Sequence, residues 1–138
     1  MIKIKKATKK EADKFAKEEW KKFNKEKNYN WKEEEFHFLA YENAKPVGYI
    51  CFEFNGGAAY LGQFIILRDS RNKGIGNKLL KKFEKTAKEK KCHLAYLETS
   101  EKNYEAIQFY KKNNYKITAE FPNNKFHLTW YILEKRFE

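Results

Sequence analysis

The segment Arg71–Gly76, read as Arg-Asn-Lys-Gly-Ile-Gly, has the residue types and spacing most suited to chemistry. Gly74 and Gly76 remove side chains where a ligand would pass, while Arg71 and Lys73 supply positive charge. A strand is expected before the segment and a helix after it, a context in which free backbone N–H groups bind phosphate. The helix dipole adds roughly half a positive charge. The segment therefore predicts a loop that binds a phosphate or pyrophosphate.

Two familiar nucleotide motifs are excluded at this loop. The dinucleotide fingerprint GxGxxG is not completed because its third glycine position is Leu79, and the pattern GxxxxGK[ST] is absent. An ordinary turn at a helix start also explains a GxG on its own. The meaning of the loop depends on the elements that position it.

The elements before the loop are predicted from hydrophobic periodicity. Ile2 and Ile4 alternate with lysines as a short strand, and Thr8 with Glu11 forms a capping box for a helix. A further helical turn is expected over 31–35. The first helix has one apolar face, made by Ala12, Phe15, Ala16, Trp20 and Phe23.

Three β-rich runs follow, over 36–41, 47–54 and 59–67, with hairpin turns at Asn43–Lys45 and Asn55–Gly57. Beyond the loop, apolar residues at helical spacing alternate with lysines. The remaining predicted elements are a strand over 94–99, a helix over 104–112, and a closing hairpin over 115–121 and 126–133. A helix between the strands 59–67 and 94–99 implies a parallel crossover within a mixed sheet.

These elements and motifs together resemble the GNAT family of N-acetyltransferases. Its members carry a strand, an [RQ]xxGx[GA] loop and a helix, then a strand, an Asn and a helix that ends in a Tyr. In this sequence the features read Leu61–Leu67, Arg71–Gly76, Leu79-Leu80, Leu94–Thr99, Asn103, Ala106, Phe109-Tyr110 and Tyr115. The resemblance runs from about Ile2 to Leu133. It implies one N-acetyltransferase domain over residues 1–138, with a mixed α/β fold: a mostly antiparallel sheet of six to seven strands and about four helices.

The chain departs from the family pattern in two places. Asn114 stands where the family usually has Gly after the last helix, and Asn is the next most tolerant residue of a left-handed turn. Arg68 stands where the loop often has Pro. Neither departure alters the fold that the resemblance implies.

The resemblance implies acetyl-CoA as cosubstrate and no metal. Phosphates would rest on backbone N–H groups of residues 72–77, and the pantetheine would pair with the backbone of residues 64–66 like an added strand. Asn103 would hydrogen-bond the pantetheine; a helix N-cap is the alternative, and the two roles are compatible. The implied cofactor-binding residues are Phe64, Ile65, Ile66, Arg71, Asn72, Lys73, Gly74, Ile75, Gly76, Asn77 and Asn103.

Direct attack of an amine on the thioester needs one proton removed and one supplied. Tyr110 stands where the family's Tyr protonates the departing sulfur, and its spacing from Ile107 puts it on the inward helix face; a packed core Tyr is the alternative. Glu98, at the end of a strand, is the first candidate for the catalytic base, and its position resembles one where some family members carry a catalytic Glu. An ordinary surface carboxylate is the alternative for Glu98, and Glu53 or water are the other candidates for the base. His127 is a weaker candidate for the acceptor site.

The oxyanion would meet a backbone N–H near Ile66, where the family separates two strands and where Gly62 predicts a bulge. Several aromatic residues line either an apolar amine pocket or the core. They are Trp20, Trp31, Tyr41, Tyr60 and Trp130.

The chain is basic, with 30 Lys and Arg against 19 Asp and Glu in 138 residues and a net charge of +11. The stretch Arg68–Lys91 alone holds ten basic and three acidic residues. Such charge attracts phosphorylated ligands or nucleic acid, but a solvated lysine-rich helix face explains much of it. Cys51 and Cys92 lack disulfide or zinc spacing, and no leader or membrane segment is visible, so the cytoplasm is expected.

Three classes of function remain open from the sequence. The preferred one is acetylation of a primary amine on a small molecule, and its close alternative is acetylation of a protein N-terminus or lysine. The third is a basic nucleic-acid-binding domain or a CoA-binding module without catalysis. No membrane partner is expected, nucleic acid is not favoured, and both monomer and homodimer are compatible with the sequence.

Overall fold

The computed structural model describes residues 1–137. Contacts among residues divide the chain into two compact units, Met1–Trp31 and the remainder from Lys32 onward. The expectation that residues 1–138 form one domain therefore stays a prediction.

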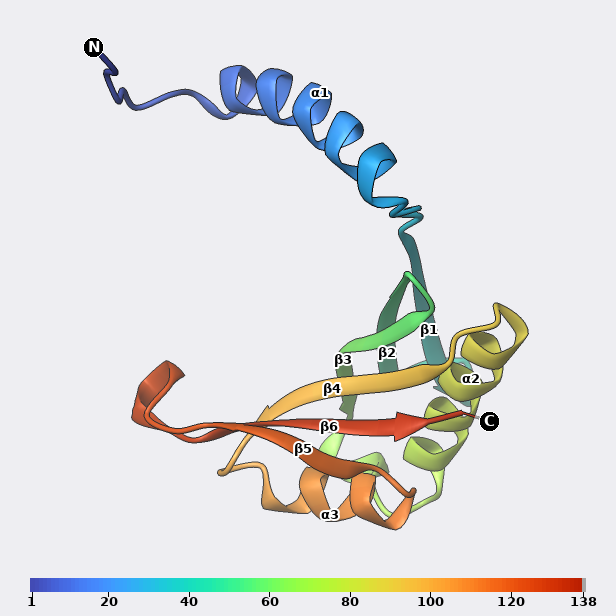
Figure 1. Cartoon of the computed structure of the whole chain (residues 1–138). Helices are drawn as coiled ribbons and strands as arrows, with labels where there is room; N and C mark the ends of the chain where they lie inside the picture. Colours follow the sequence, from blue (N-terminus) through green and yellow to red (C-terminus); the bar gives the residue numbers. More distant parts are fainter. Residues whose placement is uncertain (138) are drawn as a thin grey trace. The chain divides into compact units, whose positions relative to one another are not determined.

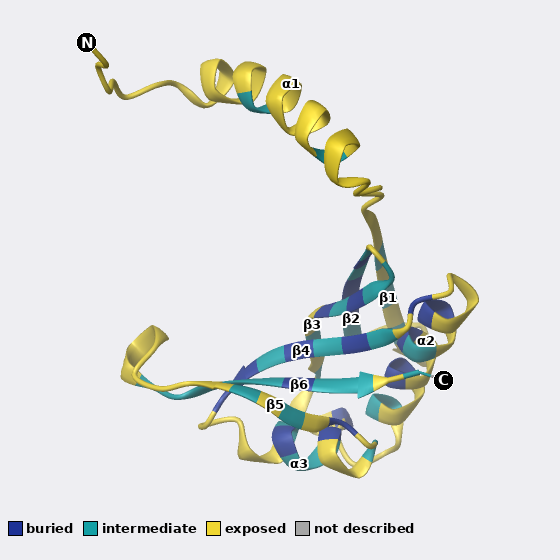
Figure 2. Ribbon diagram, viewed as in Figure 1, coloured by how far each residue is buried: buried dark blue, intermediate teal, exposed yellow. Residues whose placement is uncertain are grey.

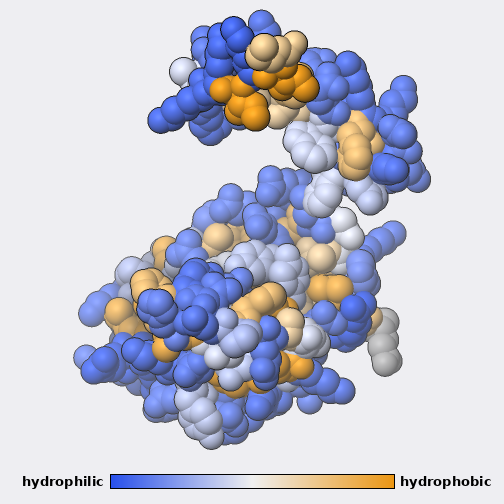
Figure 3. All heavy atoms as spheres, turned by 60° about the vertical axis from the view of Figure 1, so that its left-hand side comes forward, coloured by the Kyte–Doolittle hydropathy of each residue, from blue (hydrophilic) through white to orange (hydrophobic). Residues whose placement is uncertain are grey.

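The first unit is built around one amphipathic helix. Helix α1 spans Lys9–Lys27, and the predicted capping box is confirmed because Thr8 accepts from the Glu11 backbone while the Glu11 carboxylate accepts from the Thr8 N–H. Asn28 ends the helix in a left-handed conformation. The predicted apolar face is present, and hydrophobic residues gather on the surface of this unit (Figure 3). Within the unit, Phe15 is 73% exposed.

Two predictions for the region before the sheet were wrong. Residues Ile2–Ile4 are irregular and exposed, because among the described residues no strand pairs with them. The segment 31–35 forms no helical turn; strand β1 begins at Glu34 instead. The alternation of Phe36 and Phe38 with polar neighbours matches a strand, and pairing of that strand with the next one overrides local helix propensity.

The second unit contains a six-stranded sheet in the order β1-β2-β3-β4-β6-β5 (Figure 1). Only the β3–β4 pair is parallel, so the predicted mixed, mostly antiparallel sheet is confirmed. The strands are β1 Glu34–Glu42, β2 Lys45–Asn55, β3 Ala58–Ile66, β4 Leu94–Ser100, β5 Lys116–Phe121 and β6 Trp130–Arg136.

Helix α2, Ile75–Glu89, makes the predicted crossover from β3 to β4, and α3, Tyr104–Lys112, links β4 to β5. Short 3-10 turns occupy Arg68–Ser70 and Lys125–His127. The described residues thus hold three α-helices instead of about four, since the turn expected over 31–35 does not form.

The closing strand was predicted to begin at Phe126, but β6 begins at Trp130. Phe126 and His127 have φ of 58° and 57°, in the left-handed region that a strand cannot contain. The chain between β5 and β6 is therefore a structured turn and not part of the ladder.

The core lies between one face of the sheet and helices α2 and α3 (Figure 2). Ile50, Phe52 and Leu133 on the sheet are almost fully buried, as are Leu80 and Phe83 on α2. The rings of Phe52 and Phe83 lie 4.8 Å apart between centroids. Aromatic packing therefore fixes α2, and with it the loop that precedes it, against the sheet.

The predicted turns are confirmed by their backbone angles. Asn43 and Ala44, and likewise Gly56 and Gly57, have positive φ, as two-residue hairpin loops require. Asn114 has φ of 71°, so Asn performs the left-handed exit from α3 that Gly usually provides in the family.

Strand β3 separates from β4 after only three paired positions. Ala58, Ala59 and Tyr60 pair with β4, and the pairing then stops. The predicted bulge at Gly62 is confirmed, because Phe52 of β2 pairs with Leu61 and Cys51 pairs with Gln63. The second half of β3 consequently has one ladder edge free.

Replacing Phe83 with Ala should destabilise the protein by about 3–5 kcal/mol, because it empties a fully buried site between α2 and β2. Phe126→Ala is the matched control, since Phe126 is 82% exposed and its loss should change stability by less than about 0.5 kcal/mol. Urea unfolding measures both, and equal losses would contradict this description of the core.

Candidate active site

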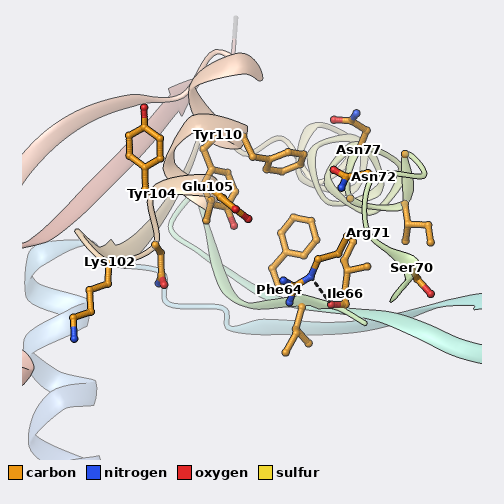
Figure 4. Close-up of a pocket in the computed structure, with 17 residues that line it drawn as sticks. Phe64, Ile66, Ser70, Arg71, Asn72, Asn77, Lys102, Tyr104, Glu105 and Tyr110 are labelled. Atoms are coloured by element: carbon orange, nitrogen blue, oxygen red, sulfur yellow. Dashed lines mark hydrogen bonds between the residues drawn. The ribbon is translucent and has the colours of Figure 1, made fainter. Parts of the chain in front are cut away.

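A cavity of about 840 Å³ lies where β3 and β4 part (Figure 4). Three segments line it: the end of β3, the loop with the first turn of α2, and the start and inner face of α3. These segments are distant in sequence. The sheet separation at Gly62 and the crossover through α2 bring them together.

The loop presents a row of free backbone donors to this cavity. Within residues 1–137, the backbone N–H groups of residues 72–77 donate to no acceptor, and the first helical bond of α2 runs from Lys78 N to Gly74 O. Asn72 and Gly74 are left-handed, with φ of 62° and 81°, which turns successive N–H groups toward a common side. The arrangement is an anion-binding concavity at a helix N-terminus.

Arg71 and Lys73, the two charged residues of the loop, behave differently. Arg71 lines the cavity, and its Nε donates to the carbonyl oxygen of Ile66 at 3.1 Å, the dashed bond in Figure 4. Lys73 does not line the cavity; its ammonium contacts the Glu42 carboxylate at 3.4 Å. Arg71 therefore joins the loop to the end of β3 and brings positive charge to the cavity.

The end of β3 contributes Phe64, Ile65 and Ile66 to the cavity wall. These residues pair with β2 on one side, and no β4 residue pairs with them on the other. An extended ligand can thus add to this edge as a strand would. Phe64 also packs edge-on against Phe109 of α3.

Asn103 occupies the N-cap position of α3, but its side chain does not cap the helix. Its Nδ2 donates instead to the hydroxyl of buried Thr99 at 2.9 Å. This bond fixes the amide so that Oδ1 remains available as an acceptor at the cavity wall. The Asn103 side chain therefore does not act as a helix cap.

Tyr110 lies on the inward face of α3 next to Ile107, as its spacing predicted. It is 7% exposed, packs against Phe109 and Tyr115, and lines the cavity. Burial raises the pKa of its hydroxyl well above the usual range. Burial alone causes this shift, and no hydrogen bond from a described residue contributes to it, so the hydroxyl stays protonated and its donor is free.

Glu98 does not line the cavity with Tyr110. Its side chain lies on the opposite face of the sheet, where the carboxylate forms an ion pair with Lys125 from the β5–β6 turn. The same ammonium lies 4.3 Å from the Trp130 ring centroid. A carboxylate at this strand end is thus held beside a cation and an aromatic ring.

Glu53 shares the face of Glu98. Glu53 pairs with Tyr60, which pairs with Tyr96, so the three side chains form one row across β2, β3 and β4. Burial raises the pKa of Tyr60, and the negative charges of Glu98 and Glu53 raise it further. This row and Glu98 make an acidic, aromatic patch in a strongly basic chain.

Of the other aromatic candidates, Trp130 is half-buried. Trp20, Trp31 and Tyr41 are 58%, 60% and 62% exposed, so core packing does not account for them. His127 Nδ1 donates a hydrogen bond to Asn123 Oδ1 at 3.1 Å.

Ten of the eleven predicted cofactor-binding residues line the cavity; Lys73 does not. Sequence reasoning missed six others: Ser70, Lys102, Tyr104, Glu105, Ala106 and Phe109. Lys102, Tyr104 and Glu105 are sequence neighbours of Asn103, which was predicted to bind the cofactor. Their proximity to Asn103 in the sequence could have identified them as cavity residues. Ala106 and Phe109 belong to the motif that carries the family resemblance, which was the signal for them, and Ser70 follows from no residue type or motif.

Comparison with known proteins gives the family. The Acetyltransferase (GNAT) family profile matches residues 5–115. The chain therefore belongs to this family. The match runs through both compact units. Among described residues, no helix has the length and apolar character needed to cross a membrane.

Three proteins similar to this chain differ in sequence identity and in the share of the chain that they cover. The uncharacterized protein YdhI of Bacillus subtilis is 38% identical over 84 residues, 59% of this chain, and the match spans half of that protein's length. A crystal structure of an acetyltransferase from Bacillus cereus has a TM-score of 0.83 at 22% identity, with 99% of this chain and 98% of that chain covered. Arabidopsis thaliana Naa50, in complex with the bisubstrate analogue CoA-Ac-MVNAL, has a TM-score of 0.66 at 28% identity, with 73% and 72% covered.

Two glycines of the loop should respond oppositely to Ala. Gly74→Ala should cost about 1–2 kcal/mol of stability because φ at Gly74 is 81°. Gly76 lies inside α2, and a Cβ there meets Ile66 and Phe109 at an ordinary 3.5 Å, so Gly76→Ala should stabilise by roughly 0.5–1 kcal/mol. Thermal unfolding with circular dichroism measures both; destabilisation by Gly76→Ala would show that the loop geometry is wrong.

Proposed function

We propose that this chain transfers the acetyl group of acetyl-CoA to a primary amine by direct attack within a ternary complex. The observation that carries the proposal is one cavity that combines five residues with unpaired backbone N–H groups, Asn72 and Gly74 to Asn77, with the protonated hydroxyl of Tyr110. Family membership and the CoA-containing analogue of Naa50 support the same donor. We further propose that residues 1–138 act as one acetyltransferase domain.

In this proposal the N–H groups of residues 72–77 bind the pyrophosphate of acetyl-CoA, with Arg71 and Lys102 supplying positive charge at the cavity. The pantetheine extends along the free edge of residues 64–66. Asn103 Oδ1 accepts from a pantetheine amide, held for this task by Thr99. Most of these contacts use backbone atoms, so the donor is recognised chiefly by chain geometry.

The reaction then needs two proton movements. The nitrogen lone pair of a neutral amine attacks the thioester carbon, and the oxyanion that forms accepts from a backbone N–H near Ile66. When the carbon–sulfur bond breaks, the Tyr110 hydroxyl gives its proton to the thiolate. The proton lost by the nitrogen passes through water to Glu98 on the opposite face of the sheet, and solvent reprotonates Tyr110.

The acceptor that we favour is a cationic amine on a small molecule. Glu53 and Glu98 provide negative charge, and Tyr60, Tyr96 and Trp130 provide aromatic surface, on the sheet face opposite α2. An ammonium is attracted to both kinds of group. It releases one proton to solvent before its nitrogen, then neutral, attacks the thioester. Lys125 already contacts Glu98 and Trp130 in this way.

A peptide acceptor is the second candidate. It is favoured by the likeness to Naa50, whose bisubstrate analogue carries the peptide sequence MVNAL. Incubation with acetyl-CoA and panels of small amines and peptides, followed by release of the CoA thiol, separates the two. Turnover with peptides alone would reject the small-molecule acceptor, and CoA binding without any amine-dependent release would reject catalysis.

Tyr110→Phe tests the acid. It should lower turnover by about ten- to a thousandfold while acetyl-CoA affinity stays nearly unchanged, because only the proton donor is lost. Tyr104→Phe is the control, since Tyr104 also lines the cavity but is 67% exposed. Steady-state kinetics and calorimetric titration measure the two quantities, and unchanged turnover would refute the role.

The raised pKa of Tyr110 also fixes a pH dependence. A hydroxyl whose pKa lies above the usual range stays protonated through neutral and mildly alkaline pH. Turnover should therefore show no alkaline decline assignable to this group below about pH 10. A descending limb near pH 8 that disappears in Tyr110→Phe would contradict this assignment.

Glu98→Gln tests the base. Turnover should fall by about ten- to a hundredfold with little change in acetyl-CoA affinity, because the proton acceptor is removed and the shape is kept. Glu53→Gln, on the same face, should have a smaller effect. The reverse order in amine-dependent kinetics would assign the role to Glu53, and equal, negligible effects would leave water as the acceptor.

A further inference from the structure

Strands β1 and β2 bring together Glu35, His37 and Cys51, which the acetyl-transfer proposal does not use. His37 lies directly opposite Cys51 in the ladder, and Glu35 lies opposite Glu53. All four side chains project from the face of the sheet that points away from α2, because the alternate residues Phe36 and Phe52 enter the core. The juxtaposition arises only from strand register.

The donor atoms of three of these residues are spaced as ligands of one small cation. Glu35 Oε1 lies 3.2 Å from His37 Nε2 and 3.6 Å from Cys51 Sγ. All three donor atoms lie within 4.8 Å of one another. Tetrahedral zinc with its usual bond lengths gives oxygen–nitrogen and oxygen–sulfur edges of about 3.4 and 3.5 Å.

The orientation of the imidazole fits the same role. His37 Nδ1 is 2.7 Å from the Tyr49 hydroxyl, and the two rings are stacked. A hydrogen bond on one ring nitrogen orients the other nitrogen of a metal-binding histidine. Neither ring nitrogen is hydrogen-bonded to the Cys51 thiol, so a thiolate–imidazole nucleophile is not what the geometry supports.

We propose that Glu35, His37 and Cys51 form a binding site for one Zn²⁺, with water in the fourth position. Sulfur, imidazole nitrogen and carboxylate oxygen are a donor set that suits zinc. The thiol releases one proton as its sulfur bonds the metal. Glu53 adds negative charge on the same face of the sheet, because it lies two residues from Cys51 along β2 and opposite Glu35.

The proposed zinc site is open to solvent at two of its ligands and closed at the third. The side chains of Glu35 and His37 are 61% and 55% exposed, whereas Cys51 is buried. None of the three lines the acetyl-CoA cavity. Zinc binding would join β1 to β2, and it can be tested without any assay of acetyl transfer.

Titration of the tag-free protein with Co²⁺, a spectroscopic substitute for Zn²⁺, tests the proposal. One equivalent should produce the visible absorption of four-coordinate Co²⁺ with a near-ultraviolet thiolate charge-transfer band, and Zn²⁺ should displace it. Cys51→Ser should abolish the charge-transfer band. Cys92→Ser is the matched control, because both cysteines are 7% exposed, and it should keep the band.

His37→Gln should weaken Co²⁺ binding at least tenfold, and Tyr49→Phe should weaken it by about ten- to a hundredfold through loss of the orienting hydrogen bond. X-ray absorption of the zinc-loaded wild type requires no variant and should give one sulfur at about 2.3 Å. Zinc without a sulfur ligand, or an unchanged charge-transfer band in Cys51→Ser, would overturn the site.

Discussion

The separation of β3 from β4 is the constraint on which the rest of this structure depends. A sheet normally satisfies the N–H and C=O groups on both edges of an inner strand, yet β3 is paired on both sides only at Ala58–Tyr60. The Gly62 bulge bends the strand at the point where the pairing ends. Everything that forms the cavity lies around the opening that results.

This opening explains why few side chains around the cavity are of types that identify a binding or catalytic site. Residues 64–66 offer a backbone edge, and residues 72–77 offer unpaired N–H groups, so the polypeptide itself provides most of the polar surface. Side chains enter at the end: Arg71 joins the loop to β3, Asn103 is fixed by Thr99, and Tyr110 brings one hydroxyl from α3. The buried aromatic packing around Phe83 holds α2 in the place that this geometry needs.

The sequence predicted features whose cause is local. The capping box at Thr8, the left-handed exit at Asn114 and the bulge at Gly62 each follow from what one residue type allows. Predictions from the sequence were wrong where a strand needed a pairing partner, or where a residue adopted a left-handed backbone conformation that its type disfavours. Ile2 and Ile4 alternate correctly but pair with no described strand, and Phe126 adopts a conformation that its residue type disfavours.

Juxtaposition across strands was the hardest property to predict. The ion pair of Glu98 with Lys125 joins β4 to a turn 27 residues later. The cluster of Glu35, His37 and Cys51 depends on the register of β1 against β2, which the spacing of cysteines and histidines does not reveal. Membership of the GNAT family fixes the fold around these residues. The register of β1 against β2 decides which side chains lie together on the sheet face that points away from α2.

The central claim is that backbone groups at the strand separation bind the donor. An amide-resolved NMR titration with CoA tests it most directly. The account predicts that the largest shifts, and new protection from hydrogen exchange, fall on the amides of residues 64–66 and 72–77. Saturable CoA binding that leaves those amides unchanged would contradict it.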